Sequence, residues 1–564
     1  MVAIAVIISI AVLALGYLTY GRFITKSFNL DDSKVTPACE INDGVDYVPA
    51  KASLLLGQHF SAIAAAGPIV GPVLAGIWFG WLPAFLWIII GAIFIGGTHD
   101  FGSLIASVRH NAASVAELVK RYMTPLSYAL FLVFIWLTLI YVIIAFTDIT
   151  AQTFKAVAAD NAFGPGVAFS SFLYLLLGVV MGILLYKFKM NLTFLTAIFM
   201  PLVIAVIWYG TVLPAPIADF LGSVTIKQWE VILLIYCLIA SMIPMWLLLQ
   251  PRGYLGGWFL YLTIVIALIG ALFGGYEIKY PAWNLDGIES LANGKWLFPI
   301  LFITVACGAC SGFHGIVSSG TTSKQICRES DTRVIGYGTM VLEAVVAILA
   351  LATVMMLPKG DAILKSDPNL VYANGLAQYM GLIGIDYNMA LAFALLAFST
   401  FVYDTLDVCT RLARYILQEL LGWQSLAGGA VATFVTLLIP FAFLLLTEEK
   451  GYLVAWPIFG TSNQLLASLI LLAVSVWMIH EGKKAIYVLV PMGFMLAVTV
   501  TSLVTQMAPF IGSLPALVSG AEVKRDIIIV GIASIVIFIL CLMIVIEAFR
   551  ILVLKRGKPA KAAA

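Results

Sequence analysis

Ionisable side chains lie inside several long apolar stretches of this 564-residue sequence. A charge in a membrane-spanning segment is costly, so such residues pair with one another or take part in moving protons and ions. The candidates for proton coupling or gating are His59, Asp100, Glu343, Asp404, Asp407 and Arg411. Asp407 and Arg411 are four residues apart, so an ion pair along one helical face is the structural alternative for these two.

Glycine, proline and hydroxyl residues interrupt three of the apolar stretches, at 57–72, 302–325 and 456–464. The first contains two Gly-Pro steps, and each proline removes an amide donor from a helix. Inside a membrane, backbone that is not helical must line a cavity enclosed by protein. The interruptions therefore predict broken helices around a transport site. Kinks that allow close helix packing are the alternative interpretation.

Residues in the three interrupted stretches are the predicted substrate ligands, because hydroxyls, amides and helix N-termini suit a carboxylate. They are His59, Ala66, Gly67, Pro68, Thr304, Ser311, Gly312, His314, Ser318, Ser319, Thr321, Thr322, Lys324, Gln325, Asn463 and Gln464. Lys324 would add a positive charge to the hydroxyl-rich run 318–323. That run lacks the P-loop pattern, so ATP-driven transport is unsupported. Energy would come from an ion gradient, or the protein would be a facilitator or a channel.

The cysteines suggest neither a metal centre nor a disulfide framework. Cys307, Cys310 and His314 have a spacing that could hold zinc, but no fourth ligand is obvious nearby. These three are weak candidates, and the sequence predicts no metal and no cofactor. The seven cysteines are scattered, most of them in apolar segments, so we expect free thiols.

The composition describes a chain that lies mostly inside lipid. Hydrophobic residues make up 62% of it and charged residues 11%, whereas soluble proteins carry about 25% charged residues. The mean hydropathy is +1.05. The 31 basic residues nearly balance the 29 acidic ones, which leaves no basic face for nucleic acid. A soluble enzyme is also excluded, and we expect a polytopic membrane protein that is not an enzyme.

A membrane span needs about 20 apolar residues. Fifteen stretches qualify: 2–20, 54–79, 82–108, 126–146, 167–186, 192–213, 230–250, 254–275, 297–323, 335–357, 388–410, 426–446, 452–479, 485–505 and 527–550. Weaker stretches at 148–166 and 370–386 change this count, and we expect about 15 to 18 helices in one transmembrane domain, 1–564.

Lysine and arginine are concentrated in alternate loops, which are predicted to be cytoplasmic. This pattern places the N-terminus outside and the C-terminus inside, and the odd number of spans agrees with it. We therefore expect a cytoplasmic loop at 21–53, an extracellular loop at 276–296 and a basic cytoplasmic tail at 551–564.

Several of these motifs resemble the carbon starvation protein A family of bacterial inner-membrane transporters. The resemblance rests on the runs 58–72, 304–314, 318–325 and 459–467, supported by 329–331, 335–338 and 405–407 with Arg411 and Arg414. These runs follow one another along most of the chain. One departure is His99, which precedes Asp100 where relatives often carry glutamine.

The resemblance implies peptide uptake when carbon is scarce, with some members acting as pyruvate transporters coupled to protons. It also implies a LeuT-like core of the amino acid–polyamine–organocation superfamily, with two inverted five-helix repeats and two broken helices. We therefore expect a secondary active transporter that imports short peptides across the inner membrane by proton symport. A pyruvate/proton symporter is the alternative, and a passive channel or a nutrient sensor is more remote. Expected partners are the small peptide or pyruvate, protons and the lipid bilayer; the sequence leaves the oligomeric state open.

Overall fold

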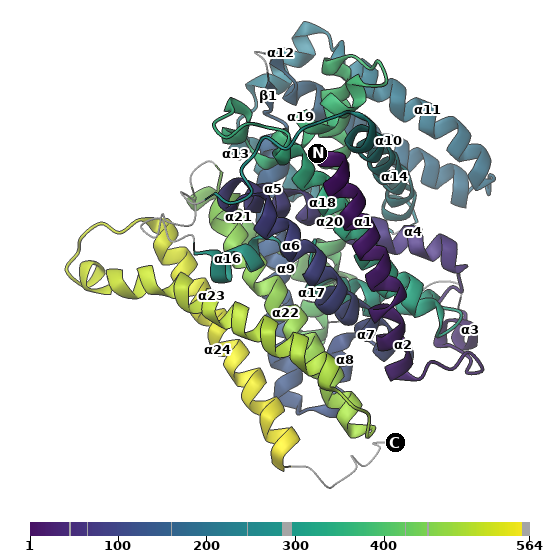
Figure 1. Ribbon diagram of the computed structural model, residues 1–564, viewed down its shortest axis with the longest axis vertical. Helices are drawn as coiled ribbons and strands as arrows, with labels where there is room; N and C mark the ends of the chain where they lie inside the picture. Colours follow the sequence, from purple (N-terminus) through teal and green to yellow (C-terminus); the bar gives the residue numbers. More distant parts are fainter. Residues whose placement is uncertain are drawn as a thin grey trace.

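The computed structural model is a bundle of long helices (Figure 1). It describes residues 1–43, 47–64, 66–158, 161–244, 246–284, 296–423, 425–447 and 450–554. Within these ranges the strands are limited to β1 (Val157–Ala158) and β2 (Asn161–Ala162), which pair antiparallel. The predicted all-α class is confirmed.

Twelve described stretches of helix are long and apolar enough to cross a membrane. They are α1 (Val2–Leu18) with α2 (Tyr20–Phe28), α6 (Trp81–Gly91) with η1 (Ala92–Gly96) and α7 (Gly97–Val108), α9 (Pro125–Thr153), α10 (Gly164–Tyr186), α11 (Leu192–Thr211), α14 (Leu249–Phe273), η5 (Arg333–Tyr337) with α18 (Gly338–Met355), α20 (Tyr387–Leu421), α21 (Leu426–Leu446), α22 (Tyr452–His480), α23 (Ile486–Val518) and α24 (Arg525–Leu554). Two bent pairs raise the total to 14: α4 (Ala52–Ile63) with α5 (Gly67–Phe79), and α12 (Ala215–Ser223) with α13 (Ile226–Met242). The protein is therefore a multi-pass membrane protein.

The predicted count of 15 to 18 helices is too high for the described residues. The expected span 297–323 is divided into α16 (Leu297–Thr304) and α17 (Gly312–Val317), and each of these is too short to cross a membrane. The weaker stretch 370–386 contains α19 (Pro368–Gly381), which has only 14 residues, and 148–166 contains the end of α9 and the strand pair. The helix count therefore gives no support to the predicted orientation of the termini.

Short helices and turns complete the described chain. They are α3 (Pro37–Ile41), α8 (Val115–Tyr122), η3 (Ser318–Thr322), η4 (Ser323–Gln325) and η6 (Ala362–Lys365). The predicted loop 21–53 contains most of α2 and all of α3, and α2 extends the first candidate span to Phe28. Most of the predicted loop 276–296 and most of the tail 551–564 lie outside the described residues.

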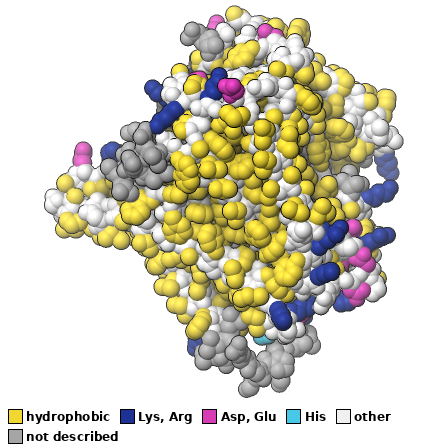
Figure 2. All heavy atoms as spheres, viewed as in Figure 1, with side chains coloured by type: hydrophobic (Ala, Val, Ile, Leu, Met, Phe, Trp, Pro, Cys, Tyr) yellow, Lys and Arg dark blue, Asp and Glu magenta, His cyan; other side chains and the backbone are white. Residues whose placement is uncertain are grey.

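The most enclosed helices are α20 and α22, in which 89% and 94% of the most apolar stretch is buried, against 22% in α11. Large apolar side chains cover the middle of the outer surface (Figure 2). Charged side chains gather at the lower right of that view, where α2 and α3 lie. Such a surface suits helices that meet lipid along their length and water at their ends.

Three helices that enter the core contain a π-helical turn. These turns are η1 directly before α7, η3 directly after α17 and η5 directly before α18. A π turn places one extra residue in the helix, and such turns are frequent at functional sites. The three helices in question carry the charged cluster described in the next subsection.

The glycine at position 460 allows α22 to touch the carbonyl group that ends α16. A Cβ atom there would clash with the backbone oxygen of Ile303. We expect Gly460→Ala to lower the melting temperature in detergent, with a cost of about 1–3 kcal/mol, because backbone must move to relieve the clash. Gly493→Ala on α23 is the matched control, since nothing lies within 4 Å of its added Cβ. Equal melting temperatures for the two variants would contradict the close contact.

Candidate functional site

The first predicted break separates α4 from α5, whose axes differ by 46°. Pro68 lies in the first turn of α5, where its missing amide hydrogen costs no helical hydrogen bond. Gly67 lies against the Cys307 side chain, and Gly71 lies against the carbonyl oxygen of Thr304. The start of α5 therefore packs directly on the second break.

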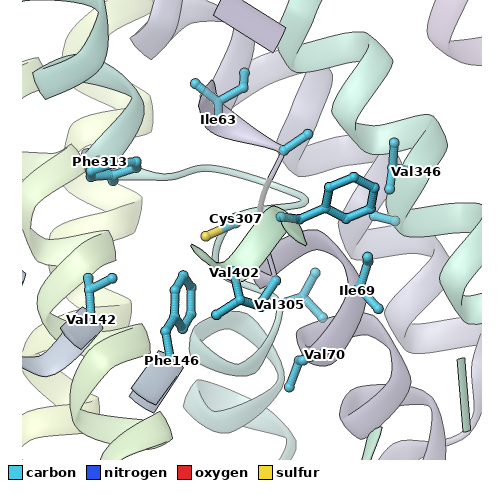
Figure 3. Close-up of a cluster of buried hydrophobic side chains, with 14 of the residues drawn as sticks. Ile63, Ile69, Val70, Val142, Phe146, Val305, Cys307, Phe313, Val346 and Val402 are labelled. Atoms are coloured by element: carbon cyan, nitrogen blue, oxygen red, sulfur yellow. The ribbon is translucent and has the colours of Figure 1, made fainter. Parts of the chain in front are cut away.

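At the second predicted break, seven residues lie outside a helix, between α16 and α17. Indole groups bond two of the freed carbonyl oxygens: Trp87 donates to Val305 at 3.2 Å, and Trp456 donates to Thr304 at 3.4 Å. Figure 3 shows Val305, Cys307 and Phe313 of this segment among side chains of α4, α5, α9, α18 and α20. The two breaks thus meet in the centre of the molecule.

The third predicted break does not exist, since α22 is continuous from Tyr452 to His480. Pro457 is only the sixth residue of this helix, so it removes one hydrogen bond near the end without interrupting the helix. The side-chain amides of Asn463 and Gln464 instead form hydrogen bonds with the backbone at the second break. Asn463 Oδ1 accepts from the backbone N–H of Phe313 at 2.9 Å, and Gln464 Nε2 donates to the carbonyl oxygen of Phe302.

A histidine bridges two carboxylates beside the breaks. His314 Nδ1 lies 2.8 Å from Asp100 Oδ2, and His314 Nε2 lies 3.2 Å from Glu343 Oε2 without hydrogen-bond alignment. His99 Nδ1 contacts the other oxygen of Asp100 at 2.7 Å. All four side chains have an exposed fraction of 0%. We call these four residues the central cluster; they come from α7, α17 and α18.

Another predicted residue, His59, adjoins the segment that follows α17. His59 Nδ1 of α4 contacts Thr322 Oγ1 of η3 at 2.8 Å. Its Nε2 is buried and has no hydrogen-bond partner among the described residues, and the same holds for Nε2 of His99 and both carboxyl oxygens of Glu343. Buried polar atoms are nearly always hydrogen-bonded. A group of buried polar atoms without partners is therefore typical of a site that binds a ligand or a proton transiently.

Histidine suits this position chemically. Its ring can accept a proton on one nitrogen and donate from the other, and it titrates close to neutrality in the absence of perturbation. Between two carboxylates, an imidazole can therefore hold a proton and pass it from one side to the other. The cluster is also closed to solvent, so a proton that enters it is separated from water.

Asp404 and Asp407 belong to a second, separate cluster. Arg252 of α14 donates to Asp404 Oδ1 from Nε at 2.8 Å and from Nη2 at 2.6 Å, and its Nη1 contacts Asp407 Oδ2. The Tyr236 hydroxyl donates to that same Asp407 oxygen at 2.9 Å. Sequence reasoning missed Arg252 because it lies between the expected spans 230–250 and 254–275.

The alternative of an Asp407–Arg411 pair is wrong. Arg411 Nη2 instead donates to the carbonyl oxygens of Ala240 and Ile243 at 3.0 and 2.6 Å, at the C-terminal end of α13. The last carbonyl groups of a helix lack helical partners and carry partial negative charge. Arg411 therefore caps the C-terminal end of α13, while Arg252 forms ion pairs with both Asp404 and Asp407.

The other predicted ligands divide between the core and the surface. Ser318 Oγ is buried and has no partner in the described chain, and Ser319 Oγ donates to the carbonyl oxygen of Gly315 at 2.8 Å. Thr321 is exposed. Lys324 and Gln325 are half-buried, and the Lys324 amino group lies 5.4 Å from the centre of the Tyr47 ring.

The weak zinc candidates do not form a shared site in the described ranges. Asn463 Nδ2 donates to Cys307 Sγ at 3.6 Å, and His314 is engaged by the two carboxylates. Cys310 is a buried free thiol. In that part of the chain no three His, Cys, Asp or Glu side chains are arranged to hold a metal ion.

Removing Arg252 alone tests the second cluster. We expect Arg252→Met to destabilise the fold by about 3–5 kcal/mol, because two buried carboxylates lose their cation. The triple variant R252M/D404N/D407N should recover a large part of this loss, since no uncompensated charge remains. Thermal unfolding in detergent measures both variants. If the triple variant is no more stable than R252M, the two aspartates do not depend on Arg252.

Comparison with known proteins agrees with the predicted resemblance. A family model described as Carbon starvation protein CstA matches residues 1–374 and 361–502. A peptide transporter CstA of Helicobacter pylori is 32% identical over 573 residues, which cover 89% of this chain and 82% of that protein. The pyruvate/proton symporter BtsT of Escherichia coli is 30% identical over 575 residues, with 86% and 78% covered.

Among solved structures, a mutant of an Eremococcus coleocola manganese transporter is similar with a TM-score of 0.45 and 13% identity, covering 91% of this chain and 99% of that one. The family model extends over most of the chain, and the relatives align along nearly its whole length. The chain belongs to the carbon starvation protein CstA family.

Proposed function

We propose that this chain is a secondary active transporter that imports short peptides by proton symport. The observation that supports it is the meeting of two helix breaks at a buried histidine held between two carboxylates. Breaks expose backbone groups that bind a substrate, and the histidine supplies a site for a proton. The name of the Helicobacter pylori relative agrees with a peptide substrate.

Three of the unbonded polar atoms are acceptors, which suit the donor groups of a peptide. Gln464 Oε1 and both oxygens of Glu343 are buried, have no hydrogen-bond partner among the described residues and need donors. The ammonium group and the amide N–H of a peptide are donors, whereas pyruvate offers only acceptors. The second candidate, pyruvate/proton symport, is supported by the name of the Escherichia coli relative.

In this proposal, His314 couples proton movement to transport together with Asp100, Glu343 and His59. Protonated His314 would balance one carboxylate, and its loss of the proton would leave both carboxylates uncompensated. Two uncompensated buried charges are costly, so loss of the proton from His314 would disfavour the present packing of α7, α17 and α18. Asp404, Asp407 and Arg411 would instead connect α13, α14 and α20, which is a gating role.

The proposed architecture is a LeuT-like core in the bacterial inner membrane, with the N-terminus outside and the C-terminus in the cytoplasm. The two broken helices, α4–α5 and α16–α17, support this architecture because discontinuous helices line the substrate site in such transporters. The basic residues at the ends of α7 and α8 support a cytoplasmic position for that face.

Uptake into proteoliposomes tests the function directly. With an inward proton gradient, we expect a labelled dipeptide to accumulate and a protonophore to abolish the accumulation. Labelled pyruvate, measured beside it, tests the second candidate. If neither compound accumulates, the symport proposal is wrong for this chain, and current recordings would then test the channel alternative.

A single variant tests the coupling residue. We expect Glu343→Gln to reduce gradient-driven uptake to the level seen without a gradient, because the amide cannot exchange a proton. Counterflow of labelled for unlabelled dipeptide should persist, since it needs no net proton movement. Glu117→Gln, in an exposed Glu117–Lys120 pair, is the matched control and should behave as the unaltered protein. Full concentrative uptake by E343Q would exclude Glu343 from coupling.

A further inference from the structure

The segment around α3 is joined to the chain that follows the second broken helix. Thr36 Oγ1, just before α3, donates to the carbonyl oxygen of Ile326 at 2.6 Å. The backbone N–H of Ala50 donates to the carbonyl oxygen of Gln325 at 3.0 Å. Residues 29–43 and 47–50 therefore lie beside residues 325–330. We call this contact the clasp.

An ion pair strengthens the clasp and connects it to the central cluster. Arg109, at the end of α7, donates to both carboxylate oxygens of Glu329 at 2.9 and 2.7 Å and to the carbonyl oxygens of Phe28 and Asn29. The backbone N–H of Asp31 also donates to Glu329, at 2.9 Å. Because Glu329 is buried and bonded twice to one guanidinium, the contact is specific in geometry.

Two thiols meet at the edge of this clasp. Cys39 is exposed on α3, and Cys327 is partly buried directly after Ile326. Thr36, three residues before Cys39, bonds the carbonyl oxygen of the residue next to Cys327, and the Cys39 sulfur helps to raise the pKa of the Cys327 thiol. Cys327 also donates to the carbonyl oxygen of Ala50 at 3.2 Å. The remaining cysteines of the chain are buried: Cys237, Cys307, Cys310, Cys409 and Cys541.

We propose that Cys39 and Cys327 form a reversible disulfide that locks the clasp and stops transport. The lock rests on the proposed transport function, whereas the pairing of the two thiols does not.

The oxidation can be written with a peroxide as the oxidant. The Cys39 sulfur attacks one peroxide oxygen; an S–O bond forms, the O–O bond breaks, and a sulfenic acid and one water result. The Cys327 sulfur then displaces the hydroxyl group, forming the S–S bond and a second water. The two thiols lose two electrons and two protons, and hydrogen peroxide is reduced to two waters.

The exposed thiol is the one that reacts first. Burial and the nearby Cys39 sulfur raise the pKa of the Cys327 thiol, so Cys327 carries less thiolate than an exposed cysteine would. Cys39 meets the solvent, and Cys327 is held against it by the hydrogen bonds of Thr36 and Ala50. This division gives Cys39 the attacking role and Cys327 the resolving role.

The position of the clasp explains how the bond would affect transport. Residues 325–330 directly follow η3 and η4, where Thr322 contacts His59, and they precede η5 and α18, which carries Glu343. Arg109 follows α7, which carries Asp100. For the closed central cluster to open on this face, these elements must separate from residues 29–43 and 47–50. A covalent bond between Cys39 and Cys327 prevents that separation.

The experiment uses the full-length protein in proteoliposomes, treated with hydrogen peroxide and then with an alkylating reagent. Peptide mapping should detect a Cys39–Cys327 linked peptide, and dipeptide uptake should be lost and then restored by dithiothreitol. Cys39→Ser and Cys327→Ser should each keep uptake after peroxide. Cys541→Ser, a buried cysteine on α24, is the matched control and should remain sensitive.

Three results would overturn the proposal: absence of the linked peptide after peroxide, a linked peptide with undiminished uptake, or peroxide inhibition of the two serine variants as strong as that of the unaltered protein. If the reduced protein transports no substrate, the proposed function fails, while the linked peptide still decides the pairing. Tryptic cleavage after Arg328 then tests the lock, because the oxidised clasp should resist cleavage relative to the reduced one. Equal cleavage in both states would exclude a lock.

Discussion

The rest of this structure depends on how the backbone of the second break is bonded inside the membrane. Lipid cannot accept or donate hydrogen bonds, so carbonyl and N–H groups freed between α16 and α17 need partners from neighbouring helices. Trp87 of α6 and Trp456, Asn463 and Gln464 of α22 supply them. These bonds fix the positions of α6 and α22 around the break and bring His314 to its place between the two carboxylates.

The two buried charged clusters differ in what their cation can do. Arg252 keeps its proton under all physiological conditions, so its contacts with Asp404 and Asp407 can change only if helices move. His314 can gain or lose a proton without any movement of the backbone. One cluster is therefore suited to hold α13, α14 and α20 together, and the other to change its charge during a cycle.

The parts of the site that depend on local sequence could be predicted, and the parts that depend on long-range packing could not. The Gly67-Pro68 step and the polar run 304–325 indicated two real breaks, because these residue types disfavour an uninterrupted helix that faces lipid. The run around Pro457 misled, since proline near the start of a helix costs little. His59, Asp100, His314 and Glu343 were each singled out, but their meeting depends on helices far apart in the chain. The role of Arg252 depends on the packing of α14 against α20, which no local sequence pattern predicts.

The π turns have a consequence for the direction in which the central side chains point. One residue rotates a helix by about 100°, so the extra residue in η1, η3 or η5 sets the angular position of everything beyond it. Asp100 follows η1, Glu343 follows η5, and Thr322 ends η3. If one of these turns tightened to a regular α-helix, the side chain beyond it would swing away from its histidine partner without any change in the length of the bundle. The three π turns thus set the rotation of their helices beside the histidines and carboxylates of the central cluster.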